Sequence, residues 1–220
     1  MSTSAPEQTE TIYQLKITLR GISPLIWRRV LVRSDTTIAH LHAIVQITMG
    51  WENLHLHRFR IQGRAYGVAR LGSLLFADDA AQVRLSRFRL RAGERFLYEY
   101  DLDDLWQHDI RLDGVRLAAP PHWYPVCIAG AGTGPPEDCG GPAGYRRLVD
   151  ERSSWPVLLQ VQDDLVLVAE RLLTVLDGGP RPTDDDTAFV AALDRMNDRL
   201  EEAPSAFNRR AVNAALRRTL

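Results

Sequence analysis

The sequence predicts an α+β domain in which a mainly antiparallel sheet is built from hairpins. Apolar and polar residues alternate in short paired segments, and turn-forming residues separate the two members of each pair. A helical repeat follows the first pair, so the chain opens as strand, strand, helix, in the manner of a β-grasp fold, and this N-terminal helix should pack on the sheet. Helical spacing returns near the C-terminus, which predicts helices that complete the domain.

The first hairpin joins residues 12–19 to residues 26–32. Both segments have the period of two that is typical of half-buried strands, and Gly21–Pro24 interrupts them. Residues 34–36 offer hydroxyl and carboxylate groups that can cap a helix. Apolar residues at helical intervals follow up to Gly50, which predicts the N-terminal helix.

Two further hairpins are expected before the middle of the chain. One pairs residues 55–61 with residues 64–69 across Gln62-Gly63, and the other pairs residues 95–100 with residues 105–112. Because each hairpin is antiparallel, the whole sheet should be antiparallel.

The second half combines a long loop with three helices. Residues 120–144 are rich in Pro and Gly but contain aromatic and aliphatic anchors, which predicts an ordered loop and not a linker. Helical periodicity predicts helices over residues 155–176, 184–200 and 206–216.

The composition of the 220 residues is that of an ordinary globular chain, with 45% hydrophobic and 25% charged residues. No apolar run approaches the roughly 18 residues that span a bilayer, so no membrane partner is expected. Residues 1–11 are polar and acidic, unlike a signal peptide, and we expect a disordered tail and a cytoplasmic protein. Cys127 and Cys139 are the only cysteines, so a disulfide scaffold is excluded and reduced thiols are expected.

The formal net charge of −1 conceals an uneven distribution. Residues 11–100 carry 14 basic and 6 acidic groups, a balance of +8, whereas residues 101–186 carry 7 and 16, a balance of −9. Either the two parts attract each other within the fold, or the basic part meets a polar partner. In the second case five arginines would contact the phosphates of a nucleic acid. They are Arg28, Arg29, Arg58, Arg60 and Arg64.

A cluster of carboxylates and a histidine surrounds the turn of the third hairpin. Asp101, Asp103, Asp104 and His108 could bind a cation or form an acid–base pair, in which Asp104 orients His108. The same carboxylates could instead accept the hydrogen bonds of an Asx turn. Glu137 and Asp138 lie in a stretch stiffened by Pro and Gly, where they could face a ligand or cap a helix near Pro142.

Two other groups of residues have the chemistry of metal ligands. His108, Cys127 and Cys139 could bind zinc, although no Cys-x-x-Cys pair is present and buried apolar cysteines are the alternative. His55 and His57 would share one strand face and could hold a metal or serve as structural partners. Phosphate-loop, Rossmann, nucleophile-elbow and metalloprotease motifs are absent.

Several spaced motifs together resemble the plasmid pRiA open-reading-frame-three-like family. They are Tyr13–Ile17, Ile26–Val30, Leu41-His42, Met49–Trp51, His55–Phe59, Tyr98–Asp101, Asp104–His108 and Pro135–Tyr145. Members of this family are also described as passenger TnpR-type proteins of insertion elements. The resemblance covers about residues 12–150, and Phe207 with Asn213 resembles the family's closing helix. It implies one α+β domain over residues 12–220, with residues 155–200 as a variable helical insertion.

The sequence departs from the family pattern at two places. Leu102-Asp103 stands where Phe-Gly is usual, and Gly134 stands where a third Cys is common. The missing Cys weakens a zinc site carried over from the family, and Asp103 stands where a glycine would allow a positive φ in the tight turn.

These observations lead to two hypotheses about function. The first is a ligand- or metal-binding domain, which could also be an enzyme that uses acid–base chemistry. The acid–base residues of this domain would be Asp101, Asp104, His108, Glu137 and Asp138. We expect His108, Cys127 and the 137–138 loop to converge there. Side chains that would contact a small-molecule ligand are Trp51, His55, His57, Trp106 and Tyr145. The second is a non-catalytic interaction module associated with a mobile element, which contacts nucleic acid or protein through the arginines named above.

Overall fold

The computed structural model describes residues 10–67, 79–119, 122–183, 185–202 and 206–220. The chain divides into two compact units. The first contains residues 1–145 and 206–220, and the second contains residues 146–205.

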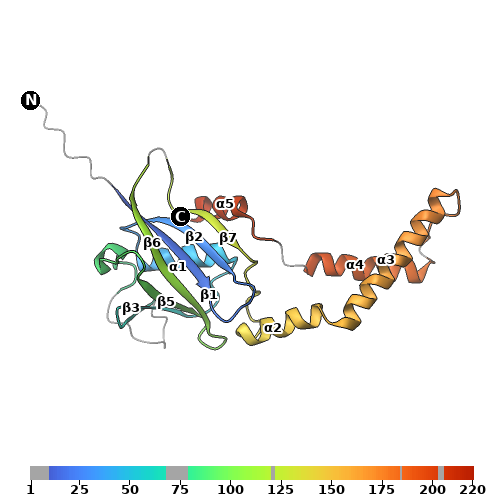
Figure 1. The fold of residues 1–220 in the computed structure, drawn as a ribbon, viewed down its shortest axis with the longest axis horizontal. Coiled ribbons are helices and arrows are strands. Elements are labelled where there is room, and N and C mark those ends of the chain that lie inside the picture. Colours follow the sequence, from blue (N-terminus) through green and yellow to red (C-terminus); the bar gives the residue numbers. More distant parts are fainter. Residues whose placement is uncertain (1–9, 68–78, 120–121, 184, 203–205) are drawn as a thin grey trace, which may run out of the picture. The chain divides into compact units, whose positions relative to one another are not determined.

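A single antiparallel sheet forms the centre of the first unit (Figure 1). Its strand order is β4-β3-β5-β6-β1-β2-β7 over the described residues. The strands are β1 (Thr11–Leu19), β2 (Trp27–Arg33), β3 (His57–Ile61), β4 (Arg64–Tyr66), β5 (Arg95–Tyr100), β6 (Trp106–Leu117) and β7 (Val126–Ala131). The three predicted hairpins therefore form, and β6 and β1 join the second half of the sheet to the first.

Helix α1 (Ile38–Met49) packs into the same hydrophobic core as the strands. Thr37 caps its first turn by accepting a hydrogen bond from the backbone N–H of His40. Gly50 ends the helix with a φ of 84°, a left-handed conformation that suits glycine. A short 3-10 turn, η1 (Leu85–Phe88), adds two buried side chains to the core.

Helix α5 (Arg209–Thr219) returns the end of the chain to the first unit. Leu216 is fully buried, and the amide of Asn213 makes two hydrogen bonds to the backbone of Cys127, through Oδ1 at 2.7 Å and Nδ2 at 2.9 Å. The Phe207 ring lies over the Arg28 guanidinium and fills the space beside Gly130. The Phe and Asn of the closing motif therefore fasten α5 to β7.

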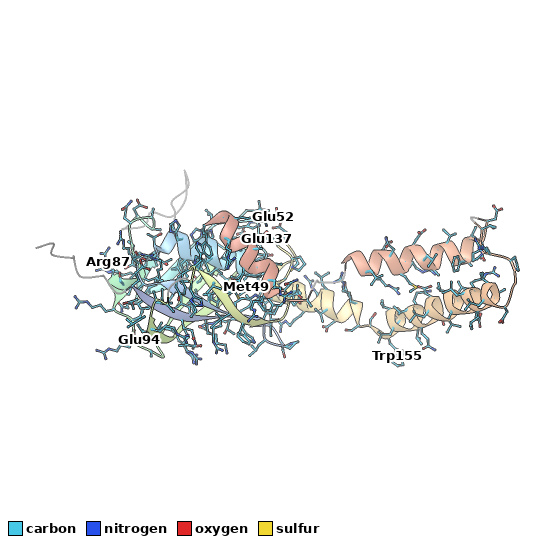
Figure 2. The ribbon with its side chains drawn as sticks, turned by 90° about the horizontal axis from the view of Figure 1, so that it is seen from above. Met49, Glu52, Arg87, Glu94, Glu137 and Trp155 are labelled. Carbon is cyan, nitrogen blue, oxygen red and sulfur yellow. The ribbon has the colours of Figure 1, made fainter. Side chains whose placement is uncertain are left out.

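The second unit is helical. Helix α2 (Gly141–Arg152) leads to α3 (Trp155–Leu176), and α3 pairs with α4 (Thr187–Glu202), as Figure 2 shows. Asp164 of α3 joins the pair because its carboxylate contacts Arg195 at 2.6 Å and Arg199 at 3.7 Å.

These elements confirm the predicted α+β class, with its hairpin-built antiparallel sheet, its N-terminal helix and its C-terminal helices. The helix over residues 155–176 has the predicted bounds, whereas the last two helices begin three residues later than predicted. Strand β7 was not predicted, because the Pro- and Gly-rich composition of residues 120–144 indicates a loop. No helix in the described ranges combines the length and apolar character that a membrane span requires.

Two sequence predictions fall partly outside the described residues. The first is the tail expected over residues 1–11, of which residues 1–9 are not described. The second is the strand expected over residues 64–69, of which the last two residues are not described.

Candidate functional site

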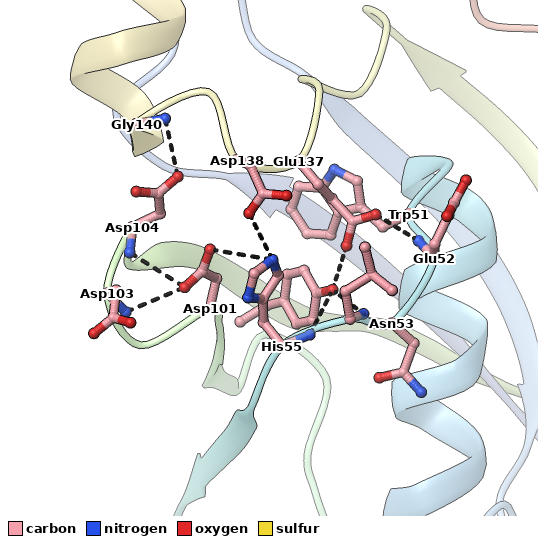
Figure 3. A network of polar contacts seen from close by, with 12 residues as sticks. Trp51, Glu52, Asn53, His55, Asp101, Asp103, Asp104, Glu137, Asp138 and Gly140 are labelled. Atoms are coloured by element: carbon pink, nitrogen blue, oxygen red, sulfur yellow. Dashed lines mark hydrogen bonds and ion pairs between the residues drawn. The ribbon is translucent and has the colours of Figure 1, made fainter.

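Three segments of the first unit meet at one polar site (Figure 3). The first follows α1 and contains Trp51–His55, the second is the turn between β5 and β6, and the third is the loop between β7 and α2. Their contacts place most of the predicted carboxylates together.

The loop after β7 is held against the segment after α1 by hydrogen bonds to backbone groups. Trp51 Nε1 donates to the carbonyl of Pro135 at 2.8 Å, and the backbone N–H of Glu52 donates to Glu137 Oε2 at 2.7 Å. At Gly134 a side chain is sterically excluded, because a Cβ atom would lie 1.9 Å from the Met49 carbonyl oxygen. Gly134, one of the two departures from the family pattern noted above, is therefore a point of backbone contact in this chain.

Tyr100 connects the same two segments to the sheet. Its hydroxyl donates to Glu137 Oε1 and accepts a hydrogen bond from the backbone N–H of Leu54 at 2.9 Å. Burial, together with the Glu137 carboxylate, raises the pKa of Tyr100 well above its usual value, so the phenol stays a proton donor. Both carboxylate oxygens of Glu137 are thus occupied in positioning the loop.

His55, Asp101 and Asp138 form a group that could hold a metal ion. His55 Nε2 lies 2.8 Å from Asp138 Oδ1 and 3.8 Å from Asp101 Oδ2, and the three ligand atoms all lie within 4.8 Å of one another. The Asp101 side chain is 7% exposed, whereas that of Asp138 is 65% exposed. The group therefore has a buried side and a side open to solvent.

The second oxygen of Asp101 fixes the turn between β5 and β6. Asp101 Oδ1 accepts hydrogen bonds from the backbone N–H groups of Asp103 at 3.2 Å and Asp104 at 3.3 Å, as in an Asx turn. Asp104 Oδ2 in turn accepts one from the backbone N–H of Gly140 at 3.0 Å. Asp101 can thus stabilise the turn with one oxygen while the other oxygen faces His55. The Asx turn and a position suited to cation binding, which were the two alternatives for these carboxylates, are therefore compatible.

Backbone strain is concentrated in the same segments. Asn53, Asp101, Leu105 and Asp138 adopt left-handed φ values between 53° and 62°, and they are four of the six described non-glycine residues with positive φ. This conformation is unfavourable for residues with a Cβ, most of all for leucine, and such strain is often found at functional sites.

His108 is a core residue and not a member of this site. It is fully buried, its ring packs edge-on to Trp51 at 5.2 Å, and neither ring nitrogen has a hydrogen-bond partner among the described residues. Burial lowers its pKa to about 3, so the imidazole is neutral at pH 7. The expected pair of Asp104 with His108 does not form, because Asp104 binds Gly140 instead.

The three expected zinc ligands are not brought together. Cys127 is buried on β7, and β1 and β2 separate that strand from β6, which carries His108. Cys139 is partly buried beside the core, and burial raises the pKa of both thiols. In this fold both cysteines fit the apolar alternative, and the expected convergence of His108, Cys127 and the 137–138 loop is not found.

The other predicted ligand-binding residues divide between the site and the core. Trp51 and His55 belong to the site, where Trp51 stacks on Tyr100 at 5.0 Å. Trp106 is fully buried, and His57 is buried with its ring stacked 3.4 Å from His42. Tyr145 packs in part against the core at the start of α2.

The predicted basic surface is largely used within the fold. Arg28 is buried and donates to backbone carbonyls, Arg29 pairs with Asp113, and Arg58 and Arg60 both pair with Glu99. The Arg29–Asp113 pair joins the basic part of the sequence to the acidic part, as does Arg20–Asp109, whereas Glu99 lies in the basic part itself. The pairs that cross between the parts agree with the first explanation of the charge asymmetry, attraction within the fold.

Tyr100 was not predicted to belong to the site, and His55 was expected to contact a ligand or to share a metal with His57, not to meet Asp101 and Asp138. The available signal was the position of Tyr100 directly before Asp101 in one of the motifs. The role of His55 depends on a backbone turn that brings it to Asp138, and no local pattern indicates that contact.

The fold and site together define an α+β domain with a histidine–carboxylate cluster at the junction of three loops. A family model described as plasmid pRiA4b ORF-3-like protein matches residues 11–155, and the chain belongs to this family. The chain is 33% identical over 144 residues to the uncharacterized protein y4hQ of Sinorhizobium fredii (strain NBRC 101917 / NGR234), covering 64% of this chain and 72% of that protein. It is also similar to the crystal structure of a protein of unknown function, MM3350 from Methanosarcina mazei Go1. That match has a TM-score of 0.61 and 31% identity and covers 67% of this chain and 84% of the other.

Proposed function

We propose that this domain binds a divalent metal ion through His55, Asp101 and Asp138. The observation that carries the proposal is the mutual approach of the three ligand atoms, all within 4.8 Å. A metal ion with ligand distances of about 2.0–2.2 Å holds neighbouring ligand atoms roughly 3–4 Å apart, so small side-chain rotations suffice.

The donor set favours a borderline metal ion. One imidazole nitrogen favours Zn²⁺ or another transition metal, whereas two carboxylates also accept Mn²⁺. Because Asp138 is 65% exposed, an ion here would keep at least one coordination position for water or a ligand. A metal-bound water has a lowered pKa, which makes this arrangement suitable for hydrolytic or acid–base chemistry.

Neighbouring residues support the ligands in the way that metal sites require. Tyr100 and the backbone N–H of Glu52 hold Glu137, and Glu137 precedes the ligand Asp138. The N–H groups of Asp103 and Asp104 hold the ligand Asp101. Such supporting hydrogen bonds orient ligands before the ion arrives.

The test is calorimetric titration of the chelator-treated full chain with Zn²⁺ and with Mn²⁺. We expect one ion per chain, and the variants His55→Ala and Asp101→Asn should weaken binding at least tenfold, a typical loss for altered metal sites. Asparagine keeps the oxygen that accepts the turn's hydrogen bonds and tolerates a positive φ, so the fold should persist. His40→Ala and Asp103→Asn are the matched controls, because neither side chain belongs to the cluster. Absence of uptake by the wild-type chain, or equal affinity in all four variants, would refute the proposal.

A second candidate function, contact with a polyanion, is supported by a groove between α5 and β7. The groove has a volume of about 390 Å³, and its lining includes Arg209, Arg210 and Arg217, all exposed. Among the described residues, none of these three guanidinium groups makes an ion pair with a carboxylate. In this candidate function, the backbone of a nucleic acid would bind in the groove and not at the five arginines of the N-terminal half that the sequence suggested.

Salt-dependent binding of a labelled single-stranded oligonucleotide tests this second candidate. Arg210→Ala with Arg217→Ala should weaken binding and reduce the salt dependence by about two phosphate contacts. The control pair, Arg64→Ala with Arg95→Ala, removes exposed arginines from β4 and β5. Wild-type affinity in the α5 double variant, or absence of binding by the wild-type chain at low salt, would exclude the groove.

A further inference from the structure

Helix α3 carries an apolar stripe that its partner helix α4 does not cover. Three sets of positions repeat every seven residues along α3, and all ten residues in them are exposed. The sets are Trp155, Gln162, Ala169 and Leu176; Leu158, Leu165 and Leu172; and Leu159, Val166 and Leu173. Nine of the ten are apolar, and the exception is Gln162.

The opposite side of α3 is the one that contacts α4. Asp164 pairs there with Arg195 and Arg199, and Arg171 pairs with Asp186. The positions of Asp164 and Arg171 lie about half a turn from the centre of the stripe, given 3.6 residues per turn. In Figure 2, Trp155 lies on the side of α3 that is turned away from α4.

The exposure of this stripe is too large to be incidental. Trp155 is 73% exposed, Leu165 50%, Leu173 59% and Leu176 80%, and the other leucines and the valine of the stripe are between 46% and 54% exposed. Together these side chains present on the order of 800 Å² per chain, the area that one partner contributes to a standard protein interface. An apolar patch of this size on a soluble protein usually marks an interaction surface.

We propose that this stripe, the ten positions of α3 named above, is the interface with a second copy of this chain. A heptad repeat of apolar residues is the sequence pattern by which helices pack against each other, with side chains of one helix between those of the other. A two-fold axis brings the same stripe of both copies together, so one self-complementary surface suffices.

The composition of the stripe favours a second copy over a charged partner. It holds no acidic or basic residue, so nothing in it selects a partner by charge. A single polar residue among apolar heptad positions sets the register between identical helices, and Gln162 has that role here. Because the stripe is three positions wide, two α3–α4 hairpins should form a four-helix bundle, with α3 against α3.

Analytical ultracentrifugation of the full chain tests this interface. At about 10–100 μM we expect a mass of twice 24.8 kDa, which should fall on dilution as mass action requires. The double variant Leu165→Glu with Leu172→Glu should sediment as a 24.8 kDa monomer with unchanged helix content by circular dichroism. Val115→Glu with Leu117→Glu is the matched control, since these β6 residues are 53% and 64% exposed, and it should remain a dimer.

A variant that is expected to strengthen dimerisation adds a test that does not depend on whether the glutamate substitutions damage the fold. Gln162→Leu completes the apolar repeat and should lower the dimer dissociation constant at least tenfold. A wild-type chain that stays monomeric at the highest concentration would overturn the proposal. So would a glutamate double variant that dimerises like the wild-type chain, or a Gln162→Leu variant with unchanged association.

Discussion

Replacing the buried Arg28 by methionine should destabilise the first unit far more than the same change at its neighbour Arg29. Arg28 is 2% exposed, and burial lowers its pKa to about 10, so it remains charged at neutral pH. Its guanidinium donates to the carbonyl of Thr48 at 2.7 Å and to those of Trp27 and Ala131 at 2.9 Å. One side chain therefore joins the end of α1 to β2 and β7.

The magnitude follows from the three acceptors. The Thr48 carbonyl lies in the last turn of α1, where carbonyls lack a partner within the helix. A hydrogen bond to a charged group contributes about 1.5–3 kcal/mol, and removal of the charge recovers part of its desolvation penalty. We expect a net loss of about 3–5 kcal/mol in the free energy of unfolding for Arg28→Met. Methionine also removes the contact of the guanidinium with the Phe207 ring, so the loss reports the hydrogen bonds and this cation–π contact together.

Urea unfolding followed by tryptophan fluorescence measures this difference. Arg29→Met is the matched control, because Arg29 is 31% exposed and its partner Asp113 keeps a second ion pair with Arg111. An exposed ion pair contributes about 0–1 kcal/mol. Equal losses in the two variants, or a loss below about 1 kcal/mol at Arg28, would refute the structural role assigned to the buried guanidinium.

Three further predictions concern the core, the last helix and the loop after β7. Between pH 6.5 and about 3 the unfolded chain protonates His108 and the folded chain does not, so acidification through this window should destabilise the fold. His108→Leu should flatten the pH dependence of urea midpoints, and an unchanged pH dependence in this variant would contradict the role given to His108. Asn213→Ala removes two hydrogen bonds to the β7 edge and should cost about 2 kcal/mol, with faster proteolytic release of the C-terminus. Gly134→Ala would place Cβ against the Met49 carbonyl and should lower the melting temperature by several degrees, whereas an unchanged temperature would contradict this packing.

Local sequence patterns predicted the hairpins well, because each pattern and its turn lie within about twenty residues. The alternation over residues 12–19 appears in the structure as buried odd-numbered positions, such as Leu15, Ile17 and Leu19. Strand β7 differs because its six residues contain glycine and alanine, and its pairing partner β2 lies about 100 residues earlier. No local signal reports such a long-range pairing, and the prolines on both sides favour a loop.

The sequence predicted the carboxylates and His55 as candidate site residues, but it wrongly included His108. Asp101 and Asp138 lie in turns that composition alone identifies as tight, so their presence at a loop junction follows from local patterns. His108 has a partner in each neighbouring strand, Tyr98 in β5 and Leu19 in β1, and its side chain points into the core. That burial depends on the order of strands in the sheet, which sequence spacing does not report.

The same strand order explains why the three loops meet where they do. Strand β5 ends at Tyr100 beside β3, which begins at His57, so the turn after β5 lies next to the residues that lead into β3. Those residues follow α1, whose end is tied to β7 by Arg28 through the carbonyls of Thr48 and Ala131. The loop that leaves β7 therefore starts close to the end of α1 and needs only a short path to place Asp138 beside His55. If His55, Asp101 and Asp138 bind a metal ion as proposed, the ends of all three loops must be fixed in position, and the buried arginine and the packed glycines provide that rigidity. On this reasoning the left-handed backbone of Asp101 and Asp138 is the cost of directing two carboxylates at one histidine, and a bound cation would offset it.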